Sequence, residues 1–310
     1  MGVRTLESAP PARAPLLAAN LAVVLATLLW SVGAVVASSL FQHGVSPLEL
    51  VEFRTFITAL GLAGWVAVSR LPRQPIAGNW RPLLGFGLSI ALANASLFLA
   101  IKHLPVAVAM VLQNMAPAFV IVWILLTTRR APSARVLVGI ALAMAGVALV
   151  VQLPTASLAG IDPLGVLFGL TTALGVAGFS VFGERATKVY GVARANSMAF
   201  TVAAAVWLLV QIPQGVPDLA LHPEFLGQVV VVGALGTLAP FVLFAWGSSR
   251  LGPTAGAMGI SLEPIFSAAI AWVWLGQALN LVQMAGVAAI IGGIGYMQAR
   301  RAGRAAIARR

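Results

Sequence analysis

The amino-acid sequence contains one long stretch twice. A shift of 147 positions lays LPVAVAMVLQNMAPAFV, which begins at Leu104, over LGPTAGAMGISLEPIFS, which begins at Leu251, and aligns Pro117 with Pro264. The same shift aligns further residues along both halves: Gly44 with Gly191, Phe53 with Phe200, Gly139 with Gly286, and Gly146 with Gly293. The chain therefore consists of two copies of one unit. Each copy holds an apolar segment with a proline near its middle, and two such interrupted segments at matching positions point to a transporter's binding site.

The composition places both copies in a lipid bilayer. Hydrophobic residues make up 60% of the chain, charged residues only 9%, and the mean hydropathy is +0.98, whereas a soluble domain carries about 25% charged residues. The chain has no cysteine, and His43, His103 and His222 fall outside the predicted spans, so we expect neither a metal site nor a cofactor. The net charge of +11 is better explained by membrane topology than by a nucleic-acid partner.

Apolar runs of about 20 residues, the length that crosses a bilayer, occur ten times. They cover approximately residues 16–41, 46–69, 82–102, 105–127, 134–152, 163–186, 193–213, 226–248, 253–275 and 280–299. The sequence thus predicts an all-α polytopic membrane protein with ten transmembrane helices. We expect an N-terminal arm, a first five-helix repeat, a linker, a second five-helix repeat and a basic tail, with the bounds 1–15, 16–152, 153–162, 163–299 and 300–310.

Basic residues predict the orientation of these spans. The two termini and every second loop hold 17 of the 19 lysines and arginines, the opposite side holds only Lys102, and Arg54 lies within a span. By the positive-inside rule both termini are cytoplasmic, which we expect at a bacterial inner membrane.

The charge pattern also relates the two copies. Five spans per copy bring the second copy into the membrane upside down, and the loops agree with this. The basic loop at 70–81 aligns with the loop around Pro217, which has no lysine or arginine, whereas the bare loop at His43 aligns with one that carries three basic residues between 185 and 194. These features predict a 5+5 inverted-topology repeat with a central cavity between the repeats near the membrane midplane.

Ionisable residues within spans are the first candidates for function, because they are costly in a bilayer. Glu263 lies near the middle of the ninth span, where an ionised carboxylate costs ~3 kcal/mol or more. It could carry a proton or bind a substrate ammonium group, or it could satisfy backbone carbonyls freed by Pro264. Arg54 in the second span needs a partner on another helix or a ligand carboxylate. Glu52 lies on the same span and shares a face with Glu49.

Neutral polar and aromatic residues complete the candidate set. Gln113 and Asn114 precede Pro117, which cannot donate a hydrogen bond to the carbonyl of Gln113 and so leaves an acceptor free near the midplane. These residues could line a cavity or could join packed helices, and Asn94 on the third span has the same two interpretations. Trp30 lies at mid-membrane and could form an aromatic wall for a substrate or fill a helix contact.

Three motifs give the chain a family resemblance that extends over residues 16–299. LLWSVGAVVAS in the first span, SPLELVEFR at the start of the second and LEPIFSAAIAWVWLGQ in the ninth resemble the EamA branch of the drug/metabolite transporter superfamily. The resemblance, which is strongest to aromatic-amino-acid exporters, implies export of small metabolites, commonly amino acids, by alternating access. The family often ends its ninth span with Gly-Glu, whereas Gly276 is followed here by Gln277.

Other function classes have weaker support. The sequence contains no GxSxG or HExxH motif that would indicate an enzyme, and no nucleotide-binding loop. A channel would need a ladder of similar polar groups, and the two copies do not supply one. We therefore predict a secondary exporter of small metabolites, with amino acids, aromatic or otherwise neutral, implied by the resemblance. The alternative is a transporter of sugars, nucleotide sugars or cationic drugs, and a channel is a weaker alternative. The sequence does not determine proton coupling or oligomeric state.

Overall fold

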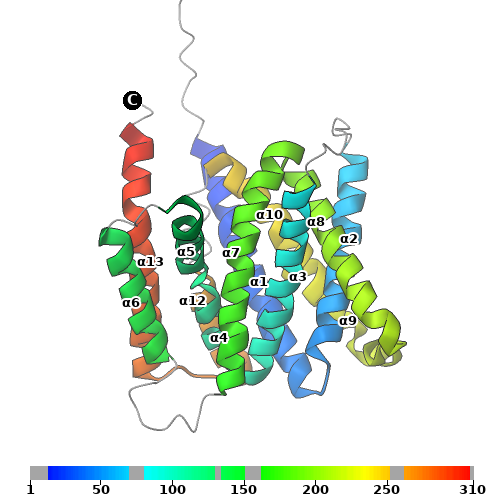
Figure 1. The fold of residues 1–310 in the computed structure, drawn as a ribbon. Coiled ribbons are helices and arrows are strands. Elements are labelled where there is room, and N and C mark those ends of the chain that lie inside the picture. Colours follow the sequence, from blue (N-terminus) through cyan, green and yellow to red (C-terminus); the bar gives the residue numbers. More distant parts are fainter. Residues whose placement is uncertain (1–12, 70–79, 130–133, 151–161, 252–261, 308–310) are drawn as a thin grey trace, which may run out of the picture.

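The computed structural model describes residues 13–69, 80–129, 134–150, 162–251 and 262–307, and within these ranges the chain is all-helical, without a strand (Figure 1). The predicted all-α class is confirmed. The helices in chain order are α1 (Arg13–Gln42), α2 (Pro47–Val68), α3 (Arg81–His103), α4 (Val106–Gln113), α5 (Ala116–Thr128), α6 (Ala134–Val150), α7 (Pro163–Tyr190), α8 (Val192–Gln211), the short turns η2 (Ile212–Gln214), η3 (Asp218–Leu221) and η4 (Pro223–Phe225), α9 (Leu226–Val230), the π-helix η5 (Val231–Leu238), α10 (Ala239–Leu251), α12 (Glu263–Leu275) and α13 (Leu281–Ile307).

Seven helical segments within the described residues are long and apolar enough to cross a membrane. They are Leu16–Gln42, Pro47–Val68, Arg81–His103, Val106–Thr127, Pro163–Tyr190, Val192–Gln214 and Pro223–Ser248. Three shorter apolar helices, Leu137–Gly146, Glu263–Leu275 and Leu281–Gly293, fall within the other three predicted spans. The multi-pass membrane class is thus confirmed, while the first part of the ninth predicted span lies outside the described residues.

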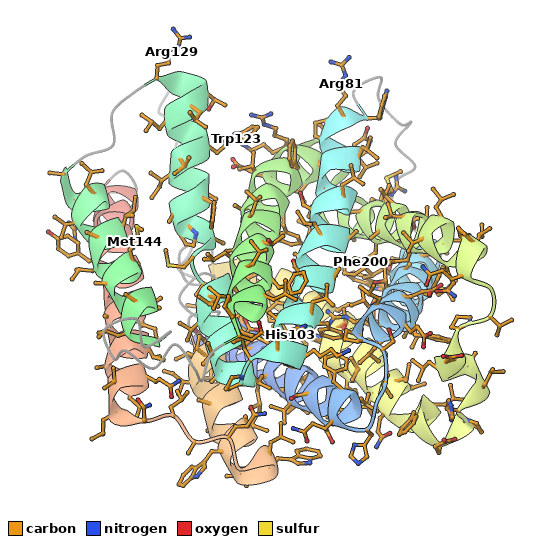
Figure 2. All side chains as sticks on the ribbon, turned by 60° about the horizontal axis from the view of Figure 1, so that its bottom comes forward. Arg81, His103, Trp123, Arg129, Met144 and Phe200 are labelled. Carbon is orange, nitrogen blue, oxygen red and sulfur yellow. The ribbon has the colours of Figure 1, made fainter. Side chains whose placement is uncertain are left out.

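The helices lie side by side, and the start of α1 and the end of α13 lie at the same end of the molecule (Figure 1). Arg81 and Arg129 also lie toward this end, whereas His103 lies at the other end of α3 (Figure 2). We call the first the termini end and the second the opposite end. Most of the core consists of small and branched apolar side chains, and many large apolar residues stay exposed, including Leu60 and Val273. Such an exterior suits contact with lipid rather than water.

Several helix bounds in the two halves coincide under the shift of 147 positions. Helices α5 and α12 both have 13 residues, both begin one residue before a proline, and both end at a residue with left-handed backbone, Arg129 and Gly276 respectively. Helices α6 and α13 begin at matching positions, and Gly44 and Gly191 both adopt positive φ in the turns after α1 and α7. The sequence repeat is therefore also a repeat of local structure.

Packing between the halves is reciprocal. Helix α1 packs against η5 and α10, while α7, its counterpart, packs against α3, the counterpart of η5 and α10. Helices α6 and α13 pack against each other at one edge of the molecule (Figure 1). There a Cβ on Gly146 would lie 2.6 Å from the carbonyl oxygen of Gly286, and one on Gly293 would lie 2.7 Å from that of Gly139. The shift of 147 positions maps the contact of Gly146 with Gly286 onto the contact of Gly293 with Gly139. Such reciprocal contacts are typical of two units related by a two-fold axis.

One segment departs from this correspondence. The second half carries the π-helix η5 where the first half has the regular helix α3. The hydroxyl of Thr237 donates to the carbonyl of Val232, 2.9 Å away, and a Cβ on Gly33 of α1 would lie 2.7 Å from the Cα of Gly236. Only glycine permits such a close backbone approach between α1 and η5.

Candidate functional site

The fourth predicted span is interrupted one turn from its proline. Helix α4 ends at Gln113, and α5 begins at Ala116 with Pro117 as its second residue. Proline has no N–H and is accepted in the first turn of a helix, so it fits the start of α5 and not the interior of a continuous span. The side chain of Asn114 turns back and donates from Nδ2 to the carbonyl of Met110, 2.8 Å away. Asn114 thus closes the end of α4.

Glu263 opens the matching half-helix α12, with Pro264 in second place. Its side chain is buried, with 5% exposure, and Nε2 of Gln113 donates to its Oε2 across 3.3 Å. The hydroxyl of Ser31 on α1 lies 3.2 Å from the backbone carbonyl of Glu263 and donates to it. The structure therefore brings together two of the predicted site residues, Gln113 and Glu263, from the two interrupted segments.

Arg54 is buried between α2 and α3, with 6% exposure. Its Nη2 donates to Oδ1 of Asn94 across 3.0 Å, and its guanidinium carbon lies 4.4 Å from the centre of the Phe98 ring. Its Nε is buried without a hydrogen-bond partner within the described part of the chain. Arg54 and Asn94, both predicted site residues, are thus in contact, and the guanidinium keeps donor capacity.

Arg54 and Glu263 come from different repeats and lie within electrostatic range of each other. No ion pair of 4.0 Å or less joins the two side chains. In a medium of low dielectric constant, charges act on each other over longer distances than they do in water. We call the four buried or partly buried residues Arg54, Asn94, Gln113 and Glu263 the buried polar site.

Trp30 belongs to an aromatic cluster. Its ring centre lies 5.4 Å from that of Phe241 and 5.5 Å from that of Phe244. Phe241 in turn contacts Phe200 edge to face, with 5.0 Å between ring centres. Trp30 therefore fills a contact between α1 and α10, and it stays partly exposed. Its neighbour Ser31 is the residue that reaches Glu263.

Glu52 does not join the buried polar site. It is buried, with 7% exposure, and its carboxylate makes no hydrogen bond within the described residues. Glu49, on the same face, accepts hydrogen bonds from the backbone of Asp218 and Leu219, at 3.1 Å and 3.0 Å. Glu49 thus holds the turn η3 against the start of α2.

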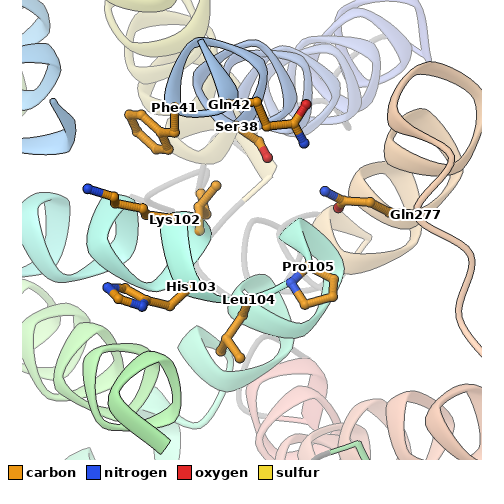
Figure 3. A pocket seen from close by; sticks show the side chains of 9 residues that line it. Ser38, Phe41, Gln42, Lys102, His103, Leu104, Pro105 and Gln277 are labelled. Atoms are coloured by element: carbon orange, nitrogen blue, oxygen red, sulfur yellow. The ribbon is translucent and has the colours of Figure 1, made fainter. Parts of the chain in front are cut away.

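A pocket of about 360 Å³ lies at the opposite end, between the ends of α1 and α3, the start of α4 and the turn after α12 (Figure 3). It is lined by Ser38, Phe41, Gln42, Ile101, Lys102, His103, Leu104, Pro105 and Gln277. None of the predicted site residues lines it. The pocket is therefore a surface feature separate from the buried polar residues.

Two residues that contact the buried polar site, Phe98 and Ser31, were not among the predicted site residues. Phe98 follows Asn94 by four positions on α3, so helical spacing alone places both on one face. Ser31 follows Trp30, a predicted site residue, directly in the sequence.

Within the described residues no group of three or more acidic, histidine or cysteine side chains could hold a metal ion.

Comparison with known proteins agrees with this architecture. The EamA-like transporter family matches the chain twice, over residues 17–152 and 163–297. A transporter of uncharacterised function from Archaeoglobus fulgidus is 27% identical, with 74% of this chain and 81% of that protein covered. The threonine/homoserine exporter RhtA of Salmonella typhimurium is also 27% identical, with 84% of each chain covered.

Two further likenesses are narrower. A probable terminal-alkyne amino-acid exporter of Streptantibioticus cattleyicolor is 32% identical over 34% of each chain. One solved crystal structure superposes with a TM-score of 0.61 at 20% identity and covers 90% of this chain and 95% of its own, which supports the fold alone. Since the two family matches together cover nearly all the spans, this chain belongs to the EamA-like transporter family.

Proposed function

We propose that this protein is a secondary exporter of amino acids and similar small metabolites, which it moves by alternating access through the region between its two repeats. The contact between Gln113 and Glu263 carries this proposal, because it joins the break between α4 and α5 in the first repeat to the start of the matching helix α12 in the second. Broken helices that meet in the membrane are where transporters hold their substrates. Two relatives are named as amino-acid exporters, which favours amino acids over sugars or cationic drugs. The likeness to aromatic-amino-acid exporters stays a prediction.

The reciprocal packing of the helices supports an inverted repeat. Two similar units inserted with opposite orientation are related by a two-fold axis in the membrane plane. The contacts of Gly146 with α13 and of Gly293 with α6 are reciprocal, as such an axis requires. The charge asymmetry of the loops supports cytoplasmic termini. On this assignment the termini end faces the cytoplasm and the opposite end faces outward.

Three polar contacts join the repeats at the opposite end. The backbone N–H of Val106 donates to Oε1 of Gln277 across 3.0 Å, and Nδ1 of His103 lies 2.6 Å from Oδ2 of Asp162. The third contact is made by Glu49, which accepts from the turn η3. In our proposal these contacts hold the outer side closed, and the outward release of substrate requires them to separate.

Counterflow in proteoliposomes tests the function. Purified protein is reconstituted with unlabelled amino acid inside, and uptake of the labelled compound is measured for L-threonine, L-homoserine, L-phenylalanine and L-propargylglycine. We expect saturable counterflow of at least one of them, and none of a sugar or a quaternary ammonium drug. Counterflow of sugars or cations with none for any amino acid would contradict the proposal.

A cross-link tests alternating access. The chain has no cysteine, so the double variant His103→Cys with Asp162→Cys offers one disulfide between α3 and the start of α7. We expect the oxidised protein to lose counterflow and the reduced protein to regain it. The single variants, treated with the same oxidant, serve as controls. Full counterflow in the oxidised double variant would refute a moving outer contact.

A further inference from the structure

Arg54 is a buried cation whose charge lacks a carboxylate at ion-pair distance within the described residues. The ion pairs recorded there involve His103, Lys188 and His222. Its contacts are the neutral amide of Asn94 and the face of Phe98, and its Nε has no partner. Desolvation of an unneutralised guanidinium is costly, and a carboxylate is its best complement because the planar fork of Arg matches two carboxylate oxygens.

Glu263 is a buried carboxylate without a cation at ion-pair distance within the described residues. Gln113 donates to its Oε2, and no described donor engages its other oxygen. The amide of Gln113 is neutral, so it fixes the carboxylate without cancelling its charge. An ammonium group, with three donors and a positive charge, is the complement of such a carboxylate.

The two groups lie on different repeats, within electrostatic range of each other but without direct contact. A ligand that carries a carboxylate and an ammonium group on one carbon offers a counter-charge to both. A simple amine satisfies only Glu263, and a simple acid satisfies only Arg54. The buried polar site thus has the electrostatic pattern of a receptor for zwitterions.

We propose that the buried polar site binds the α-amino-acid backbone, with Arg54 on the carboxylate and Glu263 on the ammonium group. Gln113 holds the Glu263 carboxylate, and Asn94 and Phe98 position the guanidinium. This inference rests on the proposed function and adds the recognition chemistry to it. The protein then selects substrates by their zwitterionic backbone, and residues outside the buried polar site contact the substrate side chain.

Ligand analogues test this inference on the wild-type protein. The amino acid with the strongest counterflow is compared with its carboxamide, which lacks the negative charge, and with its desamino acid, which lacks the ammonium group. We expect each analogue to compete ~10- to 100-fold more weakly, the effect of one lost charge-assisted hydrogen bond. Equal competition by the carboxamide would overturn the role of Arg54, and equal competition by the desamino acid would overturn that of Glu263.

Variants locate each loss. In Arg54→Gln the carboxamide should compete as well as the amino acid, while the desamino acid should still be rejected; Glu263→Gln should show the reverse. The matched controls Lys188→Gln and Glu184→Gln remove an exposed ion pair, with side-chain exposures of 71% and 69%, and should keep wild-type selectivity. Each variant is compared with wild type in monodispersity and thermal midpoint, and the neutral variant Arg54→Met replaces Arg54→Gln if the latter does not fold.

The outcomes separate this inference from the proposed function. If no amino acid is transported, the proposed function fails. If amino acids are transported but the charge variants weaken all analogues by the same factor, Arg54 and Glu263 are structural, and only the inference is overturned. A change of selectivity confined to the matching analogue supports the inference.

Discussion

Helices α5 and α12 have the same backbone but different chemistry. They share their length, the proline in second place and the left-handed residue at the end. At the first position, however, α5 has Ala116 and α12 has Glu263, and both are about 5% exposed. Before α5 stands Gln113, the donor to Glu263, whereas the segment before α12 lies outside the described residues.

This difference shows that the two copies share the geometry of this helix, while only the second copy carries a carboxylate at its first position. Both helices begin with a proline in second place, at matching positions in the two copies. A buried charge is costly in a membrane, and only one of the two matching positions carries a carboxylate. The four following predictions run from the largest expected effect to the smallest.

The largest effect is expected from a second carboxylate at the matching position. Ala116→Glu should lower the free energy of unfolding by ~3 kcal/mol or more, because it buries a carboxylate inside a membrane span. Ala134→Glu, at the exposed start of α6, is the control and should have little effect. Thermal unfolding in detergent measures both, and an Ala116→Glu protein as stable as wild type would contradict the functional difference between the half-helices.

The crossing of α6 and α13 should respond symmetrically. Gly146→Val and Gly293→Val both drive a side chain into a backbone carbonyl oxygen, at 2.6 Å and 2.7 Å for the Cβ alone. Each should cost ~1–3 kcal/mol, the usual effect of overpacking. Gly292→Val, with no atom within 4 Å of the added Cβ, controls for valine in a helix. A large effect at one glycine and none at the other would break the two-fold relation.

The ends of the half-helices should respond in opposite directions. Arg129 has φ 53° and Gly276 has φ 67°, a region in which a non-glycine residue loses roughly 1 kcal/mol. Arg129→Gly should therefore raise the free energy of unfolding, and Gly276→Arg should lower it by a similar amount. Equilibrium unfolding of both variants tests this, and a destabilised Arg129→Gly protein would be the contrary result.

The smallest effect concerns Asp162, which caps the start of α7. Hydrogen bonds from the backbone of Leu164 and from the side chain of His103 hold its pKa below the usual 3.8. Because the folded pKa is lowered, this carboxylate stabilises the fold above pH 3.8 and stops doing so as the pH falls through the lowered pKa. Asp162→Asn should be less stable than wild type near neutral pH, and the difference should shrink in acid. A difference independent of pH would contradict it.

The sequence predicted the fold better than the site. Hydropathy and the repeat are local or periodic signals, and they predicted the helical class and the approximate positions of the apolar helices, but not the π-helix η5. Which side chains meet depends on how separate helices pack, so the pairing of Arg54 with Asn94 and of Gln113 with Glu263 could not be predicted. The amide of Asn114 donates to the carbonyl of Met110 in its own helix, and its predicted role at a substrate cavity stays a prediction.

The opposite orientation of the two repeats is the central claim, and matched cysteines test it most directly. Gln42 and Val189 occupy matching exposed positions in the last turns of α1 and α7, and the native chain has no cysteine. In intact cells an impermeant maleimide should label Gln42→Cys from outside, whereas Val189→Cys should react only after permeabilisation. Labelling of both positions from the same side of the membrane would contradict the inverted repeat.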